Sequence, residues 1–194
     1  MRIVFFIKSS TINLEKYTIK DIPGSSGRLD VISRSVLAAL LGERGFEKNV
    51  EIWVFLDNYG TFMFNSNNLN YENFPKNEIL LSDYFVNYIL NFKQPNPLEM
   101  VERTELDIFN ALERFISQNF QVFILQEEGQ DFYSFFNNFN HKSNLLFIIG
   151  NQTGEMISSE DLMRFNFTRI SLGSQSYLAS SVIRLIKLNL RLII

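Results

Sequence analysis

Short apolar runs alternate along the chain with amphipathic or polar segments, a pattern that predicts strands alternating with helices. Four mainly apolar runs have the length of strands, at residues 2–7, 50–56, 121–125 and 145–149, and a further short strand is predicted at 168–171. Helices are predicted at residues 29–41, 78–90, 105–119 and 131–139 and from about residue 175 onward, with a helical turn near 158–164 and a short strand at 61–65. Uninterrupted apolar strands are typical of sheets that are covered on both sides. We therefore predict an α/β fold, a mostly parallel sheet with helices on both faces.

Two polar segments interrupt this alternation. Residues 8–27 form a long polar connection after the first strand, and connections of this length are usually functional or mobile. Residues 66–77 are rich in asparagine and predict a surface excursion. Because we find no internal repeat and no linker that divides the chain, a single domain over residues 1–194 is expected.

The first of these segments ends in a turn, Pro23-Gly-Ser-Ser-Gly27, that is followed by Arg28 and Asp30 at the start of a helix. Three later strands each end in a glycine loop, at residues 125–129, 150–154 and 171–174. Ligands of parallel sheets bind beyond the carboxyl ends of the strands. One such loop is more often an ordinary turn than a ligand contact, but three in one half of the chain favour a small ligand held by backbone amides. Neither a dinucleotide fingerprint nor a P-loop is present.

Composition narrows the chemistry. The net charge is −3, but residues 1–50 and 141–194 each carry +3 while residues 51–140 carry −9, so both candidate sites lie in basic parts of the chain. Such an uneven distribution either provides a cationic surface for phosphates or has no functional meaning.

The chain has no cysteine and one histidine, His141, which we interpret as a solvated turn residue. No metal site is therefore expected. The first apolar run is too short for a signal peptide, and no uncharged run has membrane-spanning length, so we expect a cytoplasmic protein without membrane contact.

These residues resemble a known family. Pro23-Gly24, Gly27-Arg-Leu-Asp30 and Arg34 near the beginning, and Gly150, Ser171-Leu-Gly173 and Tyr177-Leu-Ala-Ser180 near the end, are similar in order and spacing to motifs of the archaeal tRNA pseudouridine N1-methyltransferases of the SPOUT class. The resemblance covers nearly the whole chain and is weakest over about residues 58–104. The chain departs from the family pattern at Asn151, Ser181 and Val182.

The resemblance implies a SPOUT fold whose carboxyl-terminal part, about residues 120–194, forms a trefoil knot, although knots are nearly absent from proteins. It implies S-adenosylmethionine as cofactor, held mostly by backbone groups. Carried over by position, the residues that bind the cofactor are Leu125, Gly150, Ser171, Leu172, Gly173, Ser174, Tyr177, Leu178, Ala179 and Val182.

The implied activity is methylation of N1 of pseudouridine at position 54 of the T-loop of tRNA. Arg28 is the candidate for stabilising the developing negative charge and Asp30 for accepting the N1 proton, while Arg28 and Arg34 are candidates for binding RNA. Asp30 could instead form an ordinary pair with Arg34, and Arg28 could simply hold a phosphate. Two alternatives keep the fold: a methyltransferase for another RNA base or ribose hydroxyl, and a non-enzymatic RNA-binding module.

The family also implies a homodimer. In the last predicted helix, an apolar stripe of Leu178, Val182, Leu185 and Ile186 lies beside a basic stripe of Arg184, Lys187 and Arg191. A helix packed on its own domain has the same amphipathic pattern, so only the resemblance favours an interface.

Overall fold

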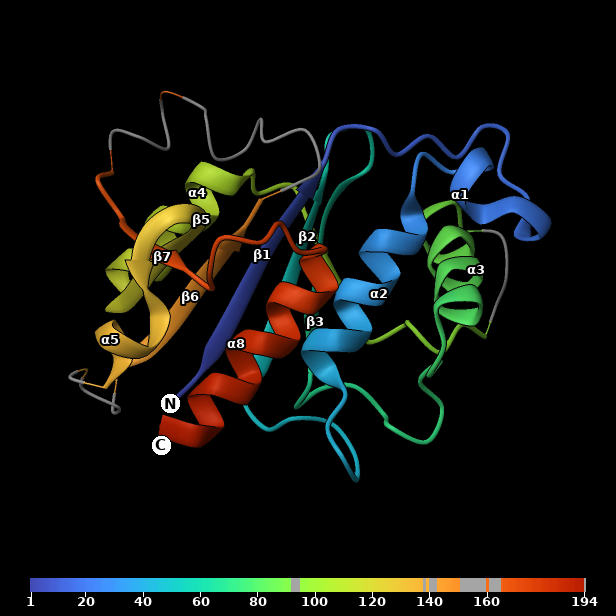
Figure 1. The fold of residues 1–194 in the computed structure, drawn as a ribbon. Coiled ribbons are helices and arrows are strands. Elements are labelled where there is room, and N and C mark those ends of the chain that lie inside the picture. Colours follow the sequence, from blue (N-terminus) through green and yellow to red (C-terminus); the bar gives the residue numbers. More distant parts are fainter. Residues whose placement is uncertain (92–94, 138, 140–142, 151–159, 161–164, 194) are drawn as a thin grey trace.

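One seven-stranded sheet forms the centre of the molecule in the computed structural model, which describes residues 1–91, 95–137, 139, 143–150, 160 and 165–193 (Figure 1). The strands are β1 (Ile3–Ser9), β2 (Val50–Leu56), β3 (Gly60–Asn65), β4 (Glu102–Thr104), β5 (Phe120–Asp131), β6 (Asn144–Ile149) and β7 (Thr168–Ser171). Their order across the sheet is β4-β3-β2-β1-β6-β5-β7. Strands β2, β1, β6, β5 and β7 pair in parallel, and β3 is antiparallel to its neighbours. The predicted, mostly parallel sheet is confirmed.

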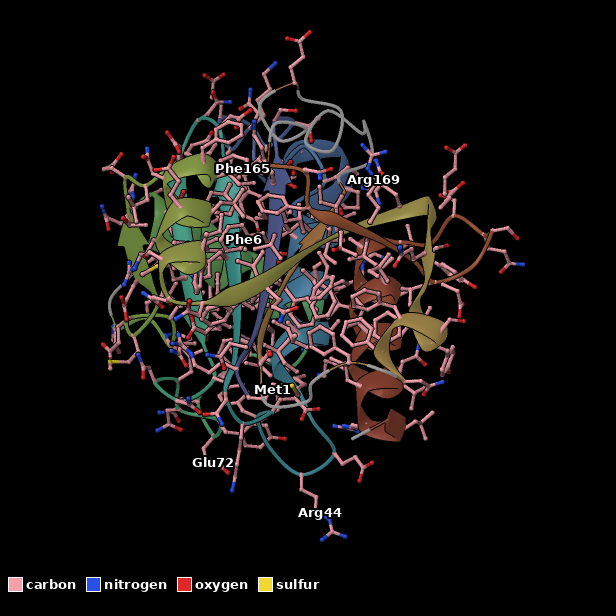
Figure 2. The ribbon with its side chains drawn as sticks, turned by 90° about the vertical axis from the view of Figure 1, so that its left-hand side faces the viewer. Met1, Phe6, Arg44, Glu72, Phe165 and Arg169 are labelled. Atoms are coloured by element: carbon pink, nitrogen blue, oxygen red, sulfur yellow. The ribbon has the colours of Figure 1, made fainter. Side chains whose placement is uncertain are left out.

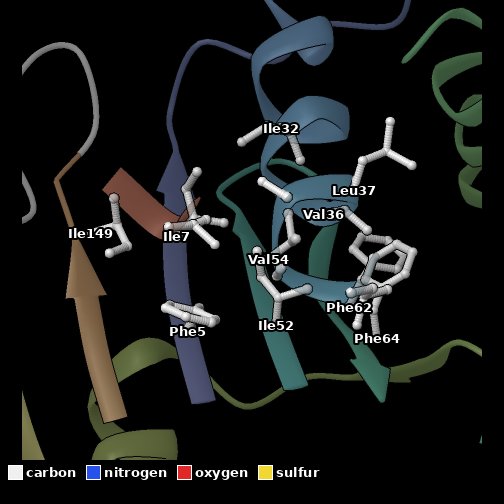
Figure 3. Close-up of a cluster of buried hydrophobic side chains, with 14 of the residues drawn as sticks. Phe5, Ile7, Ile32, Val36, Leu37, Ile52, Val54, Phe62, Phe64 and Ile149 are labelled. Carbon is white, nitrogen blue, oxygen red and sulfur yellow. The ribbon is translucent and has the colours of Figure 1, made fainter. Parts of the chain in front are cut away.

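Helices cover both faces of this sheet, as predicted. The helical elements are η1 (Ile19–Asp21), α1 (Ile22–Ser25), α2 (Leu29–Leu40), α3 (Glu78–Ile89), α4 (Ile108–Ser117), α5 (Phe132–Phe136) and α8 (Ala179–Ile193). Successive strand residues point to opposite faces, so Phe5 and Ile7 pack with the face that α2, α3, α5 and α8 cover. Val4 and Phe6 pack on the other face, against α4. Figure 3 shows α2 closing the first of these layers over β1, β2 and β3.

The strand β5 is longer than the sequence predicts. Instead of ending at Leu125 in a glycine loop, it runs to Asp131, and its register against β7 shifts because Leu125 and Gln130 both pair with Ile170. The intervening residues bulge out of the ladder, and Gly129 lies so close to β7 that a Cβ atom there would be 2.6 Å from the carbonyl carbon of Ile170. Only glycine permits this approach, because any side chain would push the two strands apart.

Two other elements differ from the prediction. Strand β4 was not predicted, because its three residues are mostly exposed and no apolar alternation marks it. Helix α8 begins at Ala179 rather than near Gln175, because the preceding residues form an irregular, exposed segment. The predicted loop at 150–154 beyond Gly150, nearly all of the turn at 158–164, and His141 lie outside the described residues. Within the described part of the chain, no helix combines the length and apolar character needed to cross a membrane.

Candidate functional site

A cavity of about 340 Å³ opens at the carboxyl end of β1. It lies at the position where the sheet order changes direction, since β2 flanks β1 on one side and β6 on the other. Parallel sheets bind ligands at such switch points. The cavity is lined by Ile7, Lys8, Ser9, Ser10, Thr11, Arg28, Val31, Ile32, Gly150, Ser176, Tyr177, Leu178 and Ala179. The two sequence motifs, more than a hundred residues apart, therefore meet around one space.

The polar connection after β1 folds back so that it holds the turn before α2. The Thr11 hydroxyl donates to the Gly27 carbonyl at 2.9 Å, and the Asn13 amide donates to the Ser26 carbonyl at 3.2 Å. Gly27 has φ +64°, and a Cβ atom there would overlap the Thr11 carbonyl oxygen at 1.8 Å. The turn therefore needs glycine at residue 27, both for its conformation and for this close approach. Buried Ile12 anchors the same connection to the core.

Arg28 follows this turn in a left-handed conformation, with φ +73° and ψ +38°. A non-glycine residue in that region stores strain, which is found at functional sites when the surrounding structure imposes it. The Ser26 hydroxyl accepts from the amide of Leu29, the first residue of α2, at 3.0 Å, and the Arg28 side chain lines the cavity. The Arg28 side chain is 45% exposed.

Asp30 orients that side chain. Arg28 Nε donates to Asp30 Oδ1 at 3.0 Å and Arg28 Nη2 donates to Asp30 Oδ2 at 3.2 Å, a bidentate pair. Arg34 Nη2 also donates to Asp30 Oδ2, at 2.6 Å, so the pairing with Arg34 that the sequence left open is present. The Asp30 side chain, however, is only 9% exposed, and the cluster is therefore not an ordinary surface contact.

The electrostatics of this cluster keep Asp30 ionised. Burial raises the pKa of its carboxyl group, but the hydrogen bonds and charge of Arg28, together with those of Arg34, outweigh burial, so that the pKa lies below its ordinary value. The first turn of α2 also favours negative charge. Because both carboxylate oxygens already accept hydrogen bonds, the geometry favours Asp30 as an orienting group over Asp30 as a proton acceptor. In return, the hydrogen bond to Asp30 raises the pKa of Arg28.

Residues 176–179 line another part of the cavity, and they follow a turn after β7 that is held by hydrogen bonds. Ser171 Oγ donates to the Glu127 carbonyl at 2.9 Å and accepts from the Gly173 amide at 3.1 Å, so the bulge of β5 and the turn after β7 are joined. Gly173 has φ +113° and open space around its Cα atom. An exposed backbone of this kind suits a ligand bound through main-chain groups.

The cavity contains four of the ten cofactor-binding residues that the resemblance implies. These are Gly150, Tyr177, Leu178 and Ala179. The other six lie outside its lining, on β5, β7, the turn that follows β7, and α8, and they are Leu125, Ser171, Leu172, Gly173, Ser174 and Val182. Arg28 lines the cavity, whereas Asp30 and Arg34 lie behind it. The roles of all these residues stay predictions.

Sequence reasoning did not single out the lining contributed by β1 and the residues after it. Lys8, Ser9, Ser10 and Thr11 line the cavity, and Lys8 pairs with Asp57 at 3.1 Å. The available signal was the length of the polar connection that begins at Lys8, because connections of that length are usually functional or mobile. The signal did not identify individual side chains.

Comparisons with known proteins agree with this geometry. Residues 1–82 match the model of a family described as a putative SAM-dependent RNA methyltransferase. A crystal structure of Archaeoglobus fulgidus Nep1 bound to S-adenosylhomocysteine superimposes with a TM-score of 0.63 at 14% identity, covering 100% of this chain and 99% of that one. This likeness shows the fold: the chain has an α/β fold with a mostly parallel sheet, as the sequence predicts, and its structural neighbour is SPOUT-like.

Curated relatives define the group more closely. The tRNA (pseudouridine(54)-N(1))-methyltransferase of Thermococcus onnurineus is 25% identical over 193 residues, covering 92% of each chain. The enzymes of the same name from Thermococcus gammatolerans and Pyrococcus abyssi are each 27% identical over 201 residues, covering 95% and 96% of this chain and 94% and 96% of their own. Over most of its length the chain is similar to the archaeal tRNA pseudouridine N1-methyltransferases, and the resemblance predicted from its motifs is confirmed.

Proposed function

We propose that this chain is an S-adenosylmethionine-dependent tRNA methyltransferase that methylates N1 of pseudouridine 54. The names of its relatives and the family description support the reaction, and the S-adenosylhomocysteine bound to the Nep1 structure supports the cofactor. One observation carries the proposal for this molecule. Arg28, Gly150 and residues 177–179 all line the cavity at the end of β1, which supports a site where an RNA base and a methyl donor meet in one space.

The residues at the donor end fit an adenosyl group. Ser171 fixes the turn after β7 by hydrogen bonds, and the open space beside Gly173 leaves its main chain accessible. We propose that the donor is held by the residues that the resemblance implies, with Gly150, Tyr177, Leu178 and Ala179 in the cavity itself. When bound, S-adenosylmethionine supplies an electrophilic methyl group on its sulfonium sulfur. The chain has to place the nucleophile in line with that methyl group.

The acceptor end fits a base that becomes negatively charged. As the bond from N1 to the methyl carbon forms and the methyl–sulfur bond breaks, N1 loses its proton and charge accumulates on the flanking carbonyl oxygens. Arg28 uses two of its five N–H groups on Asp30 in the described part of the chain, which leaves three for such oxygens or for a phosphate. In this proposal Arg28 stabilises the charge, Asp30 holds Arg28, and Arg34 contributes to RNA binding.

The proposal extends to the organisation of the chain. We propose one domain over residues 1–194, with a knotted part at about 120–194, that works as a homodimer. Helix α8 supports the dimer. Ile186, assigned to an apolar stripe by sequence, is buried within the chain, while Leu188 and Leu192 on the same helix are 51% and 69% exposed. Exposed leucines along one helix form the kind of surface that a second copy covers.

Labelled methyl transfer to tRNA transcripts with uridine or pseudouridine at position 54, followed by mass analysis of the nucleosides, tests the proposed function. We expect transfer only to the pseudouridine transcript. Transfer to RNA without pseudouridine would indicate another target, and RNA binding without any heat of S-adenosylmethionine binding would indicate a non-enzymatic module.

Two variants separate the proposed roles. Arg28→Ala should lower kcat by about 10²–10³, the effect of losing one preorganised charge-stabilising donor, while the Kd for S-adenosylmethionine stays unchanged. Asp30→Asn should lower kcat less, because the amide oxygen still accepts from Arg28. Arg44→Ala is the matched control, since Arg44 extends into solvent from the turn after α2 (Figure 2). Normal turnover by Arg28→Ala at saturating RNA would remove Arg28 from the chemistry, and complete loss in Asp30→Asn would favour Asp30 as the proton acceptor.

A further inference from the structure

A second cavity, of about 370 Å³, lies at the other end of α2, between the carboxyl end of that helix and α8. Its lining contains four cationic side chains and two carboxylates, so that their net charge is +2. The charged residues are Lys76, Arg184, Lys187, Arg191, Glu43 and Glu47. We call this cavity the basic groove. Neither the proposed reaction nor the proposed cofactor site uses it, and it shares Leu188 with the surface of α8 that supports the proposed dimer.

The basic groove forms where the two basic parts of the chain meet. Residues 1–50 contribute α2 and the turn after it, residues 141–194 contribute α8, and each part carries +3 although the whole chain carries −3. The two helices lie side by side (Figure 1). The uneven charge distribution noted in the sequence therefore becomes a local surface feature after folding.

Two of the four cations are not neutralised. Lys187 and Arg191 both pair with Glu47, and Arg191 also lies 3.9 Å from Glu43. Among the residues that the structure describes, Arg184 has no carboxylate partner, and Lys76 lies over the ring of Tyr71, 4.3 Å from its centroid. The positive charges of Arg184 and Arg191 also lower the pKa of Lys187, although burial is the larger cause. Cations that repel one another beside an open groove favour an anionic occupant.

We propose that the basic groove binds the phosphate backbone of the RNA substrate, at a second contact point away from the reacting base. This inference rests on the proposed function for the identity of the RNA. Helix α2 has twelve residues and is therefore roughly 18 Å long, so the groove is about that far from Arg28 at its other end. A base in the first cavity and a phosphate in the groove fit one RNA stem lying along α2 and α8. Phosphate contacts of this kind set affinity and register without reading sequence.

Binding of tRNA measured by fluorescence anisotropy at several salt concentrations, without S-adenosylmethionine, tests the groove. We expect Arg184→Gln and Lys76→Gln each to raise the Kd several-fold at low salt. Each should also reduce the slope of log Kd against log salt concentration by about 0.7–0.9, the value of one lost phosphate contact. Arg114→Gln on α4, at the other face of the sheet, is the matched control and should leave both quantities unchanged. Unchanged affinity and slope in the two groove variants would overturn the proposal.

The absence of cysteine from the chain allows an independent test. A hydroxyl-radical-generating iron chelate attached to Arg184→Cys should cleave bound tRNA at a discrete stretch of backbone, and the same chelate on Arg114→Cys should not. If Arg184→Gln instead changes the mass measured by light scattering and leaves RNA binding intact, the groove belongs to a contact between copies, and the proposal fails. Because these measurements need no methyl transfer, an inactive protein that shows the groove effects would refute the proposed function alone.

Discussion

The two ends of α2 use similar groups for opposite purposes. At the amino end, the Arg28 guanidinium lies beside the buried Asp30 carboxylate, keeps part of its hydrogen-bonding capacity and faces a cavity. At the carboxyl end, Lys187 Nζ donates to the carbonyls of Ala38, Ala39 and Leu41 at 2.7, 3.0 and 2.9 Å. Its side chain is only 10% exposed and also pairs with Glu47 at 3.3 Å.

The two cations differ in the number of N–H donors that remain without a hydrogen-bond acceptor. Lys187 has three N–H donors, and each one reaches an orphan carbonyl at the end of α2, so the ammonium group has nothing left for a ligand. Arg28 has five donors and uses two on Asp30 in the described part of the chain. A saturated cation fixes α2 to α8, whereas an unsaturated one is available to a substrate. The number of unused hydrogen-bond donors on a charged group therefore indicates its role better than its position in the fold does.

Removing the Lys187 ammonium group at the carboxyl end of α2 should have the largest effect on stability. Lys187→Met removes the donor for three carbonyls and leaves Glu47 without its buried partner, so the free energy of unfolding should fall by about 3 kcal/mol. Urea denaturation measures this loss. Lys48→Met, at an exposed position, should change stability by less than about 0.5 kcal/mol. An equal effect of the two substitutions would show that Lys187 does not join the helices.

Breaking the Asp30 cluster at the amino end of α2 should lower the free energy of unfolding by a smaller amount, and this loss should depend on pH. The Asp30→Asn variant should lose about 2 kcal/mol at pH 7, because Arg28 and Arg34 lose a buried charged partner and Arg28 is partly exposed. The folded pKa of Asp30 lies below its ordinary value, so its stabilising contribution is complete above the unfolded pKa of about 4 and disappears as the pH falls through the folded pKa. Urea titrations of the parent and the variant should therefore converge as the pH is lowered from about 4. A gap independent of pH in Asp30→Asn would contradict the electrostatic explanation.

The smallest expected effect concerns the support of Arg28. Thr11→Val removes the hydroxyl that holds the Gly27 carbonyl, a hydrogen bond of about 1 kcal/mol, so kcat should fall about fivefold while the Kd for S-adenosylmethionine stays constant. Thr11→Ser should restore activity because it keeps the donor. Thr18→Val, on the same connection at the cap of η1, serves as the control. If Thr11→Val and Thr11→Ser are equally active, the clamp does not position Arg28.

Local sequence patterns were sufficient for much of the fold. The apolar run at 50–56 coincides with β2, the strand predicted at 168–171 coincides with β7, and α2 begins at Leu29 as predicted, because each pattern depends only on neighbouring residues. The motif around Arg28 also identified one wall of the cavity. Gly27 made this prediction possible, because the tight turn that it permits determines the direction of the Arg28 side chain.

Other features depend on partners that are remote in sequence. The sequence places Lys187 in a basic stripe, whereas its side chain is only 10% exposed because it meets a carbonyl 149 residues away. The bulge of β5 likewise requires β7, and nothing within residues 125–129 distinguishes a bulge from a loop. The left-handed conformation of Arg28 results from the clamp at Thr11, and no propensity of arginine predicts it.

The central place of β1 has a consequence for synthesis on the ribosome. The strand pairs with β2 on one edge, and its other edge stays open until β6 appears, since Arg2 and Asn144 are 142 residues apart. At typical translation rates this delay lasts roughly ten to thirty seconds. During that time Val4, Phe5, Phe6 and Ile7 form an unpaired apolar edge, a template for aggregation. The strand that positions the cavity is thus the part of the nascent chain that most needs a chaperone.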